Sequence, residues 1–189
     1  SPLTDTVGDA SVGGNLGTQL KRAGYDGVIL TGCCNGLTGI EIVDDSVTFH
    51  DARALTGMDT DAVFEKIQNK GATAVVGPAA EKGVLFANIM VDGAFAVGRN
   101  GLGLVFARKN LKYLTIKGSG KVGVYDHDGL KKAREDIFRL IASSPILLGE
   151  RGLTHYGTGA IYDLMDSRRM MPTANFRATH FPPAHGLNA

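Results

Sequence analysis

Residues 112–118 read KYLTIKG and mark the point at which the pattern of the chain changes. Apolar and polar residues alternate in this stretch, and the period of two predicts a β-strand. Before Gly118, predicted strands mix with short helices without a regular βαβ alternation, whereas the pattern after it is helical. The sequence therefore predicts an α+β fold with a mixed sheet over residues 1–118, followed by the first helices of an all-α region over residues 119–189.

Hydrophobic periodicity and turn residues predict several elements upstream of this strand. A hairpin is expected around Asp44 and Asp45, and Asp59 or Thr60 is a suitable helix N-cap. Gly24 is a plausible helix end. The predicted elements are helices over 16–23 and 59–71, hairpin arms over 40–43 and 47–49, and strands over 26–31, 73–76 and 84–91.

Downstream of Gly118, residues 130–141 carry an apolar stripe at helical spacing. We expect an amphipathic helix here, capped by Asp128 and ended near Pro145. A second helix is predicted over residues 158–165, and residues 170–189 are predicted to form an extended arm.

Composition limits the classes of function. Of 189 residues, 43% are hydrophobic, and the charged residues balance to a net +1. This balance argues against nucleic acid or an anionic membrane as a partner, and no apolar run has the length of a membrane span. Cys33 and Cys34 are the two cysteines, and adjacent cysteines rarely form a disulfide, so a reducing, cytoplasmic setting is expected.

Glycine accounts for 26 of the 189 residues, about twice its usual share of roughly 7%. Two glycine-rich knots are notable: the first knot, residues 12–17 (VGGNLG), precedes a predicted helix, and the second knot, residues 98–103 (GRNGLG), contains Arg99. Backbone N–H groups, a helix N-terminus and an arginine can all bind a phosphate. Tight turns without a ligand explain the same pattern, so both interpretations stay open.

Other site types find less support. A dinucleotide-binding motif needs a strand before the glycines, a helix after them and an acidic residue about 20 positions later. The first knot lacks the preceding unit, and the second has no convincing helix behind it. No pair of histidines or cysteines has a zinc-type spacing, and no catalytic triad is apparent. The histidines are His50, His127, His155, His180 and His185.

Longer sequence blocks carry more information than these spacings. In order along the chain they are SPLT at 1–4, VGG at 12–14, LKRAGYDGVI at 20–29, GPA at 77–79, GRNGLG at 98–103, KNLK at 109–112 and MPTANF at 171–176. With these blocks the chain resembles the aldehyde ferredoxin oxidoreductase family from end to end. The resemblance implies a base domain that holds tungsten, or sometimes molybdenum, between two pyranopterins whose phosphates are joined by magnesium. It also implies helical domains that supply a [4Fe-4S] cluster.

The resemblance also implies roles for individual residues. The loop ending at Gly14 would bind one pterin phosphate and the magnesium, and the segment beginning at Phe95 would bind the other phosphate. The implied cofactor-binding residues are Ser11, Val12, Gly13, Gly14, Phe95, Ala96, Gly98, Arg99 and Gly101, with Ser11 and Ala96 at the metal. The family usually has Asn at Ser11, Arg at Phe95 and Gly at Ala80, so one charge-assisted phosphate contact is missing here.

By the same resemblance, the whole protein would oxidise aldehydes to carboxylic acids with ferredoxin as electron acceptor. Its cluster ligands and catalytic groups would lie in a longer polypeptide, so the present chain is expected to be inactive alone, with a homodimer possible. Two alternatives stay open: a non-catalytic module that binds a phosphate ligand or a partner protein, and a subunit of an acyl-thioester or ring reductase.

Overall fold

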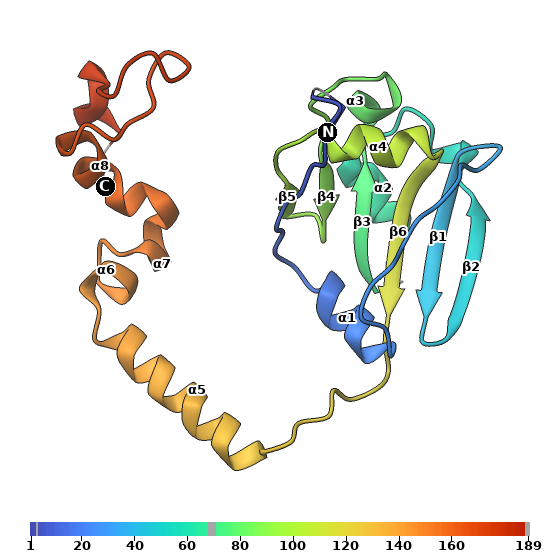
Figure 1. The fold of residues 1–189 in the computed structure, drawn as a ribbon, viewed down its shortest axis with the longest axis horizontal. Helices are drawn as coiled ribbons and strands as arrows, with labels where there is room; N and C mark the ends of the chain where they lie inside the picture. The colour runs from blue at the N-terminus through green and yellow to red at the C-terminus, as the bar shows by residue number, and fades with distance from the viewer. Residues whose placement is uncertain (3, 68–70, 188–189) are drawn as a thin grey trace. The chain divides into compact units, whose positions relative to one another are not determined.

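The computed structural model describes residues 1–2, 4–67 and 71–187, and it divides the chain into two compact units, Ser1–Gly123 and Val124–Ala189 (Figure 1). The elements of the first unit are α1 Leu16–Arg22, β1 Thr38–Val43, β2 Ser46–Asp51, the 3-10 helix η1 Arg53–Leu55, α2 Thr60–Lys66, β3 Ala72–Val76, α3 Pro78–Glu81, β4 Ile89–Val91, β5 Phe95–Val97, α4 Leu102–Arg108 and β6 Leu111–Lys117.

The strands of the first unit form one six-stranded sheet in the order β2-β1-β6-β3-β4-β5. β1 and β6 run parallel, and the other neighbouring pairs are antiparallel. The sheet is therefore mixed, and the predicted α+β class is confirmed. The hairpin around Asp44 is confirmed as well, since β1 and β2 are joined there and Asp44 has a φ of 50°.

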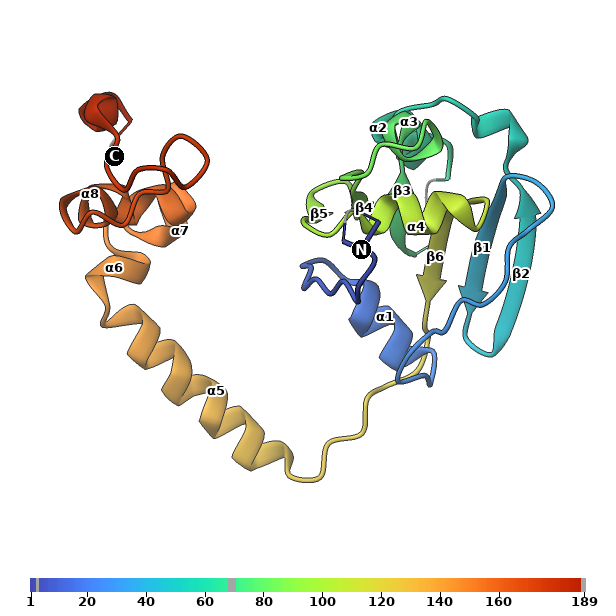
Figure 2. The ribbon, with the colours of Figure 1, turned by 45° about the horizontal axis from the view of Figure 1, so that its top comes forward.

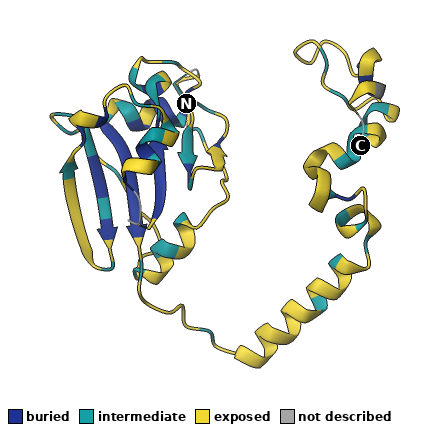
Figure 3. Ribbon diagram, turned by 180° about the vertical axis from the view of Figure 1, so that it is seen from behind, coloured by how far each residue is buried: buried dark blue, intermediate teal, exposed yellow. Residues whose placement is uncertain are grey.

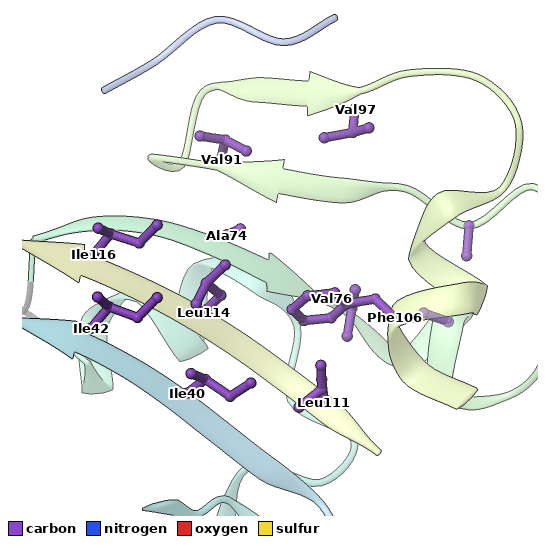
Figure 4. Close-up of a cluster of buried hydrophobic side chains, with 12 residues drawn as sticks. Ile40, Ile42, Ala74, Val76, Val91, Val97, Phe106, Leu111, Leu114 and Ile116 are labelled. Carbon is purple, nitrogen blue, oxygen red and sulfur yellow. The ribbon is translucent and has the colours of Figure 1, made fainter. Parts of the chain in front are cut away.

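Two hydrophobic clusters hold helices on opposite faces of the sheet (Figure 2). On one face, alternate residues of β1, β6 and β3 form rows of buried side chains (Figure 4). Helices α1 and α4 pack against these rows. On the other face, Val75 and Tyr113 pack against η1 and α2. The central strands are consequently the most buried part of the unit (Figure 3).

Several sequence predictions hold at the level of single elements. The helices predicted over 16–23 and 59–71 correspond to α1 and α2. Residues 68–70 of the second predicted helix lie outside the described residues. Asp59 caps α2, because its carboxylate accepts a hydrogen bond from the Ala62 N–H at 2.8 Å. The strands predicted over 73–76 and 112–117 are β3 and β6.

Other predictions are wrong. Residues 26–31 form no strand, because no described strand pairs with them, and Ile29 is 90% exposed. Of the strand predicted over 84–91, only β4 is present, since the chain turns through residues 84–87. The sequence also missed β5, and it missed α4, which begins at Leu102 within the second knot.

The second unit consists of short helices with little buried surface (Figure 3). Its longest helix, α5, is capped by Asp126 and not by Asp128, because the Asp126 carboxylate accepts from the Gly129 N–H at 2.8 Å. The helix predicted over 158–165 is divided between η2 and α8. The elements are α5 His127–Ala142, α6 Pro145–Leu148, α7 Leu153–Tyr156, η2 Gly157–Ile161, α8 Tyr162–Ser167 and η3 Pro182–Gly186. Among the described residues, no helix has the length and apolar character needed to cross a membrane.

Candidate functional site

Segments that are distant in sequence meet at one pocket of about 450 Å³ in the first unit. Asp9, Ala10 and Ser11 line it from the chain that leads into the first knot. Ala96, Gly98, Arg99 and Asn100 line it from β5 and the second knot. The structure thus places four of the predicted site residues, Ser11, Ala96, Gly98 and Arg99, around a common space.

The β4–β5 hairpin brings these segments together. β4 pairs with β3 at one edge of the sheet, and β5 pairs with β4, with Met90 opposite Ala96. Val97 is buried in the core and anchors β5, whereas Ala96 and the following Gly98 and Arg99 are exposed. The pocket therefore forms at an edge of the sheet, where the backbone remains accessible.

Phe95 packs on the glycines of the first knot. A Cβ atom added to Gly13 would lie 2.5 Å from Cδ1 of the Phe95 ring, and one added to Gly14 would lie 3.3 Å from Cδ2. Gly14 also has a φ of 93°, which L side chains rarely adopt. Both positions therefore require glycine. The Phe95 ring is 43% exposed and offers no hydrogen bond to a ligand.

The first knot has free backbone donors. Within the described part of the chain, the N–H groups of Val12, Gly13 and Gly14 donate no hydrogen bond, and all three residues are exposed. Exposed N–H groups in a glycine-rich loop are suited to an anion. Arg99 adds a guanidinium, which binds phosphate through two parallel N–H groups.

Gly101 has a structural role, because the backbone conformation and packing at this position require a glycine. It is buried, with a φ of 63°, and a Cβ atom there would lie 1.9 Å from the Leu85 carbonyl oxygen. This close approach lets α4 begin against residues 85–88. Gly101 does not line the pocket, and neither do Val12, Gly13, Gly14 and Phe95.

Ser11 and Ala96, the predicted metal residues, both line the pocket. Together with Asp9, these residues carry a hydroxyl, a backbone carbonyl and a carboxylate, which are the kinds of oxygen donor that magnesium prefers. In the described ranges, no three His, Cys, Asp or Glu residues lie close enough together to hold a metal ion.

Cysteine and histidine side chains have local partners elsewhere. The Cys33 thiol donates to the Arg108 carbonyl oxygen at 3.3 Å, and Cys34 packs against the core. Nε2 of His50 lies 2.9 Å from the Glu41 carboxylate, a contact between neighbouring strands. None of these side chains lines the pocket at the knots.

A second hollow, of about 660 Å³, lies at the end of the sheet where β3 begins and β6 ends. Asp92 and Lys117 line it, together with Phe64 and Ile67 of the α2 region. None of the predicted site residues lines it. We favour the smaller pocket, because it combines an arginine with a glycine-rich backbone.

Sequence reasoning missed some residues of the site. Asp9 and Ala10 carry no recognisable signal, because they sit in an irregular segment whose neighbours depend on tertiary contacts. Asn100 lies inside the second knot and lines the pocket. The asparagine in this glycine-rich turn was the available signal, since Asn tolerates positive φ and forms local hydrogen bonds.

Comparisons with known proteins identify the family of the chain. Tungsten-containing aldehyde ferredoxin oxidoreductases from Pyrococcus furiosus and Thermococcus kodakarensis are 33% and 34% identical over 190 residues and match 98% of this chain. An aliphatic sulfonate oxidoreductase, WOR-like subunit, from Pyrococcus furiosus is 30% identical over 196 residues and matches 94% of it. The chain spans about 31%, 31% and 30% of these relatives.

A solved structure shows the same fold. The active site complex BamBC of benzoyl coenzyme A reductase, in complex with 1,5-dienoyl-CoA, superposes with a TM-score of 0.64 at 28% identity. The match covers 72% of this chain and 22% of that one. Residues 1–118 match the family model described as "Aldehyde ferredoxin oxidoreductase, N-terminal domain". The chain therefore belongs to the aldehyde ferredoxin oxidoreductase family of enzymes.

Proposed function

We propose that this chain forms part of the cofactor site of an oxidoreductase that uses a tungsten or molybdenum bis-pyranopterin to oxidise aldehydes to carboxylic acids. In this proposal, residues 1–118 belong to the pterin-binding base domain, and residues 119–189 begin the helical region. The observation that carries the proposal is the pocket that joins Ser11 to Ala96, Gly98 and Arg99. The tungsten in the names of the relatives supports the choice of metal.

The residues of the pocket fit the phosphate end of such a cofactor. Arg99 would bind a phosphate oxygen pair, and the open backbone at Gly98, where an added Cβ would meet nothing within 4 Å, leaves room for close approach. Ser11 and Ala96 would supply oxygen ligands to magnesium. The Asp9 carboxylate would repel a bare phosphate, and a magnesium ion between them removes this repulsion.

The bound metal would supply the redox chemistry at the substrate carbon. The residues of this chain would bind and orient the cofactor: the N–H groups of residues 12–14 face one phosphate and Arg99 the other. Phe95 contributes an apolar contact to Gly13 and Gly14 and no charge. Neither Cys33 nor Cys34 is proposed to bind the [4Fe-4S] cluster, which belongs to the longer protein together with the catalytic groups.

The wider setting is proposed from the relatives. Ferredoxin would accept the electrons, an aldehyde would be the substrate, and the rest of a longer polypeptide would cover the helical unit, with a homodimer possible. The exposed apolar side chains of α5, among them Leu130, Ile137 and Phe138, support further packing of this unit. A cytoplasmic location fits this setting.

A second candidate is a reductase of acyl-thioesters or aromatic rings within the same family. The superposition on BamBC favours it, because that structure holds a dienoyl-CoA. A third candidate is a non-catalytic module that binds a phosphate ligand or a partner protein. It is supported by Phe95, which stands where the family usually has an arginine, so that Arg99 is the cation that lines the pocket.

The test uses the longer protein from the natural gene. We expect it to contain tungsten or molybdenum and pterin, and to reduce ferredoxin with an aldehyde. Arg99→Ala should lower the bound metal and pterin, whereas Arg108→Ala, an exposed arginine on α4 outside the pocket, should leave both unchanged. Turnover with an aromatic acyl-CoA instead of an aldehyde would favour the second candidate. A gene that ends at Ala189, with no metal in its product, would favour the third.

A further inference from the structure

The segment that leads into the second knot also holds the chain on both sides of Gly13 and Gly14. Asp92, at the start of the β4–β5 turn, binds the chain just after the two glycines. Asn100, in the second knot, binds the chain just before Ser11. Residues 9–15 are thus fixed at two points by side chains from residues 92–100, the same segment that supplies Ala96, Gly98 and Arg99 to the pocket.

Asp92 makes the downstream contact. Its Oδ2 accepts the Asn15 N–H at 2.7 Å, and its Oδ1 accepts the Thr73 N–H at 2.8 Å. Its own N–H donates to the Thr73 carbonyl oxygen at 2.9 Å. A Cβ atom at Gly14 would lie 2.8 Å from Oδ2, so the glycine allows this approach. One carboxylate therefore ties the first knot to β3 and to the hairpin at once.

Asn100 makes the upstream contact. Its Nδ2 donates to the Asp9 carbonyl oxygen at 2.6 Å, and its φ of 72° turns the side chain at the start of α4. A Cβ atom at Gly8 would lie 2.9 Å from the Asn100 Cβ, so the two backbones are in close contact here. The segment between Asp9 and Asn15 is left with free N–H groups and fixed ends.

We propose that Asp92 and Asn100 are positioning residues, which set the register of the first knot against Ala96–Arg99 so that both face one phosphate-bearing ligand. This inference rests on the proposed phosphate site. It adds that an acidic side chain, which touches no ligand, is needed for anion binding. A loop held at both ends loses less conformational entropy when it binds, so the positions of its N–H groups are set in advance.

Inorganic phosphate is the probe, and amide NMR spectra of the 189-residue chain report its binding at residues 12–14 and at Arg99. Asp92→Asn keeps the shape but cannot accept both N–H groups. Removing a negative charge would by Coulomb interaction alone strengthen phosphate binding. A positioning role predicts the opposite change in phosphate affinity. We expect Asp92→Asn to bind phosphate about tenfold more weakly than the wild type, because hydrogen bonds to a carboxylate are among the stronger ones.

Asp44→Asn is the matched control. Asp44 also has a positive φ, of 50°, follows a strand, and accepts a backbone N–H, that of Ser119, at 2.7 Å. Among the described residues, its carboxylate accepts hydrogen bonds from Ser119 and from no residue of either knot, so phosphate binding should stay at the wild-type level. Asn100→Ala, which changes no charge, should shift the free-state amide resonances of residues 12–14 and weaken phosphate binding as Asp92→Asn does.

The outcomes separate the two proposals. If the wild-type chain shows no phosphate-dependent shifts at either knot, the proposed phosphate site fails. If the wild type binds phosphate and Asp92→Asn binds it equally well or more tightly, the site stands and the positioning role is refuted. Equal weakening by Asp92→Asn and Asp44→Asn would also refute it, because general destabilisation would then explain the loss.

Discussion

Lys112→Met should destabilise the first unit severely, although the substitution adds an apolar residue to a core. The Lys112 side chain is completely buried. It occupies a bulge in β6: Thr38 pairs with Leu111 and Gly39 with Tyr113, so Lys112 is the extra residue between them. Its Nζ donates to the Met58 carbonyl oxygen at 2.9 Å and to the Glu81 carboxylate.

The size of the effect follows from what the substitution leaves behind. Glu81 is 15% exposed and accepts the Gly57 N–H at 2.8 Å, so its charge would keep part of its solvation. Removing one partner of a buried ion pair costs about 3–5 kcal/mol, and the partial exposure of Glu81 favours the lower end, about 3 kcal/mol. A domain of this size has a total stability of roughly 5–15 kcal/mol, so the loss would be a large part of it.

Urea unfolding, followed through the amide resonances of β6, measures the free energy of unfolding of the first unit. Lys117→Met, on the same strand with an exposed side chain, is the control and should change stability by less than about 0.5 kcal/mol. Glu81→Gln should cost a similar amount to Lys112→Met, because it leaves a buried ammonium group. The double variant should cost less than the sum by at least about 1 kcal/mol. Additive losses, or a loss below about 1 kcal/mol for Lys112→Met, would refute the buried pair as a stabilising contact.

Three further changes test the packing and charges of the two units. Gly103→Ala should cost about 1–3 kcal/mol in urea unfolding, because its Cβ would lie 2.5 Å from a backbone carbonyl oxygen before β4. Gly17→Ala in α1, where a Cβ would meet nothing within 4 Å, should be neutral or stabilising in the same assay. Hydrogen bonds from Arg53 lower the pKa of Asp51 to about 2, so this group supports folding above its unfolded pKa of about 3.9 and loses that support as the pH falls toward 2. Carboxyl NMR should show this pKa rising toward 3.9 in Arg53→Ala, and no rise would contradict the pairing. Asp126→Ala should lower the stability of α5 by about 1 kcal/mol. Amide hydrogen exchange in the first turn of α5 should become faster, and unchanged exchange would show that the cap is dispensable.

The sequence predicts best those elements whose signal is local. The period of two in β6 and the cap at Asp59 depend on neighbours in the chain, and both are found in the structure. The strand expected at 26–31 has an equally apolar sequence, yet a strand also needs a partner, and no described strand provides one. Asp128 failed as a cap of α5 for a related reason: two acids lie near the start of the helix, and the observed backbone makes Asp126 the N-cap and places Asp128 in the first turn.

The site was harder to predict than the fold. Both knots indicated a phosphate ligand, but their spacing in sequence could not show that the residues just before the first knot and those of the second knot line one pocket. That juxtaposition requires β5 at the edge of the sheet, and β5 was missed because three residues are too few for a periodic signal. Lys112 was missed too, since its burial depends on a bulge and on an acid of α3 that lies far away in sequence. The resemblance to a family supplied the pairing of the knots that local patterns could not.

Phe95 shows how the family resemblance and the geometry constrain each other. With a phenyl ring on Gly13 and Gly14, the pocket has Arg99 as its cation and Asp9 as its nearby carboxylate, so the two charges offset one another. A dianionic phosphate in such a pocket gains little from the side-chain charges. In the proposed site, its binding would come from the backbone N–H groups beside the pocket and from a metal ion held by the pocket oxygens. The positions of those N–H groups then matter more than net charge, and this is why two uncharged or acidic side chains, Asn100 and Asp92, can govern an anion site.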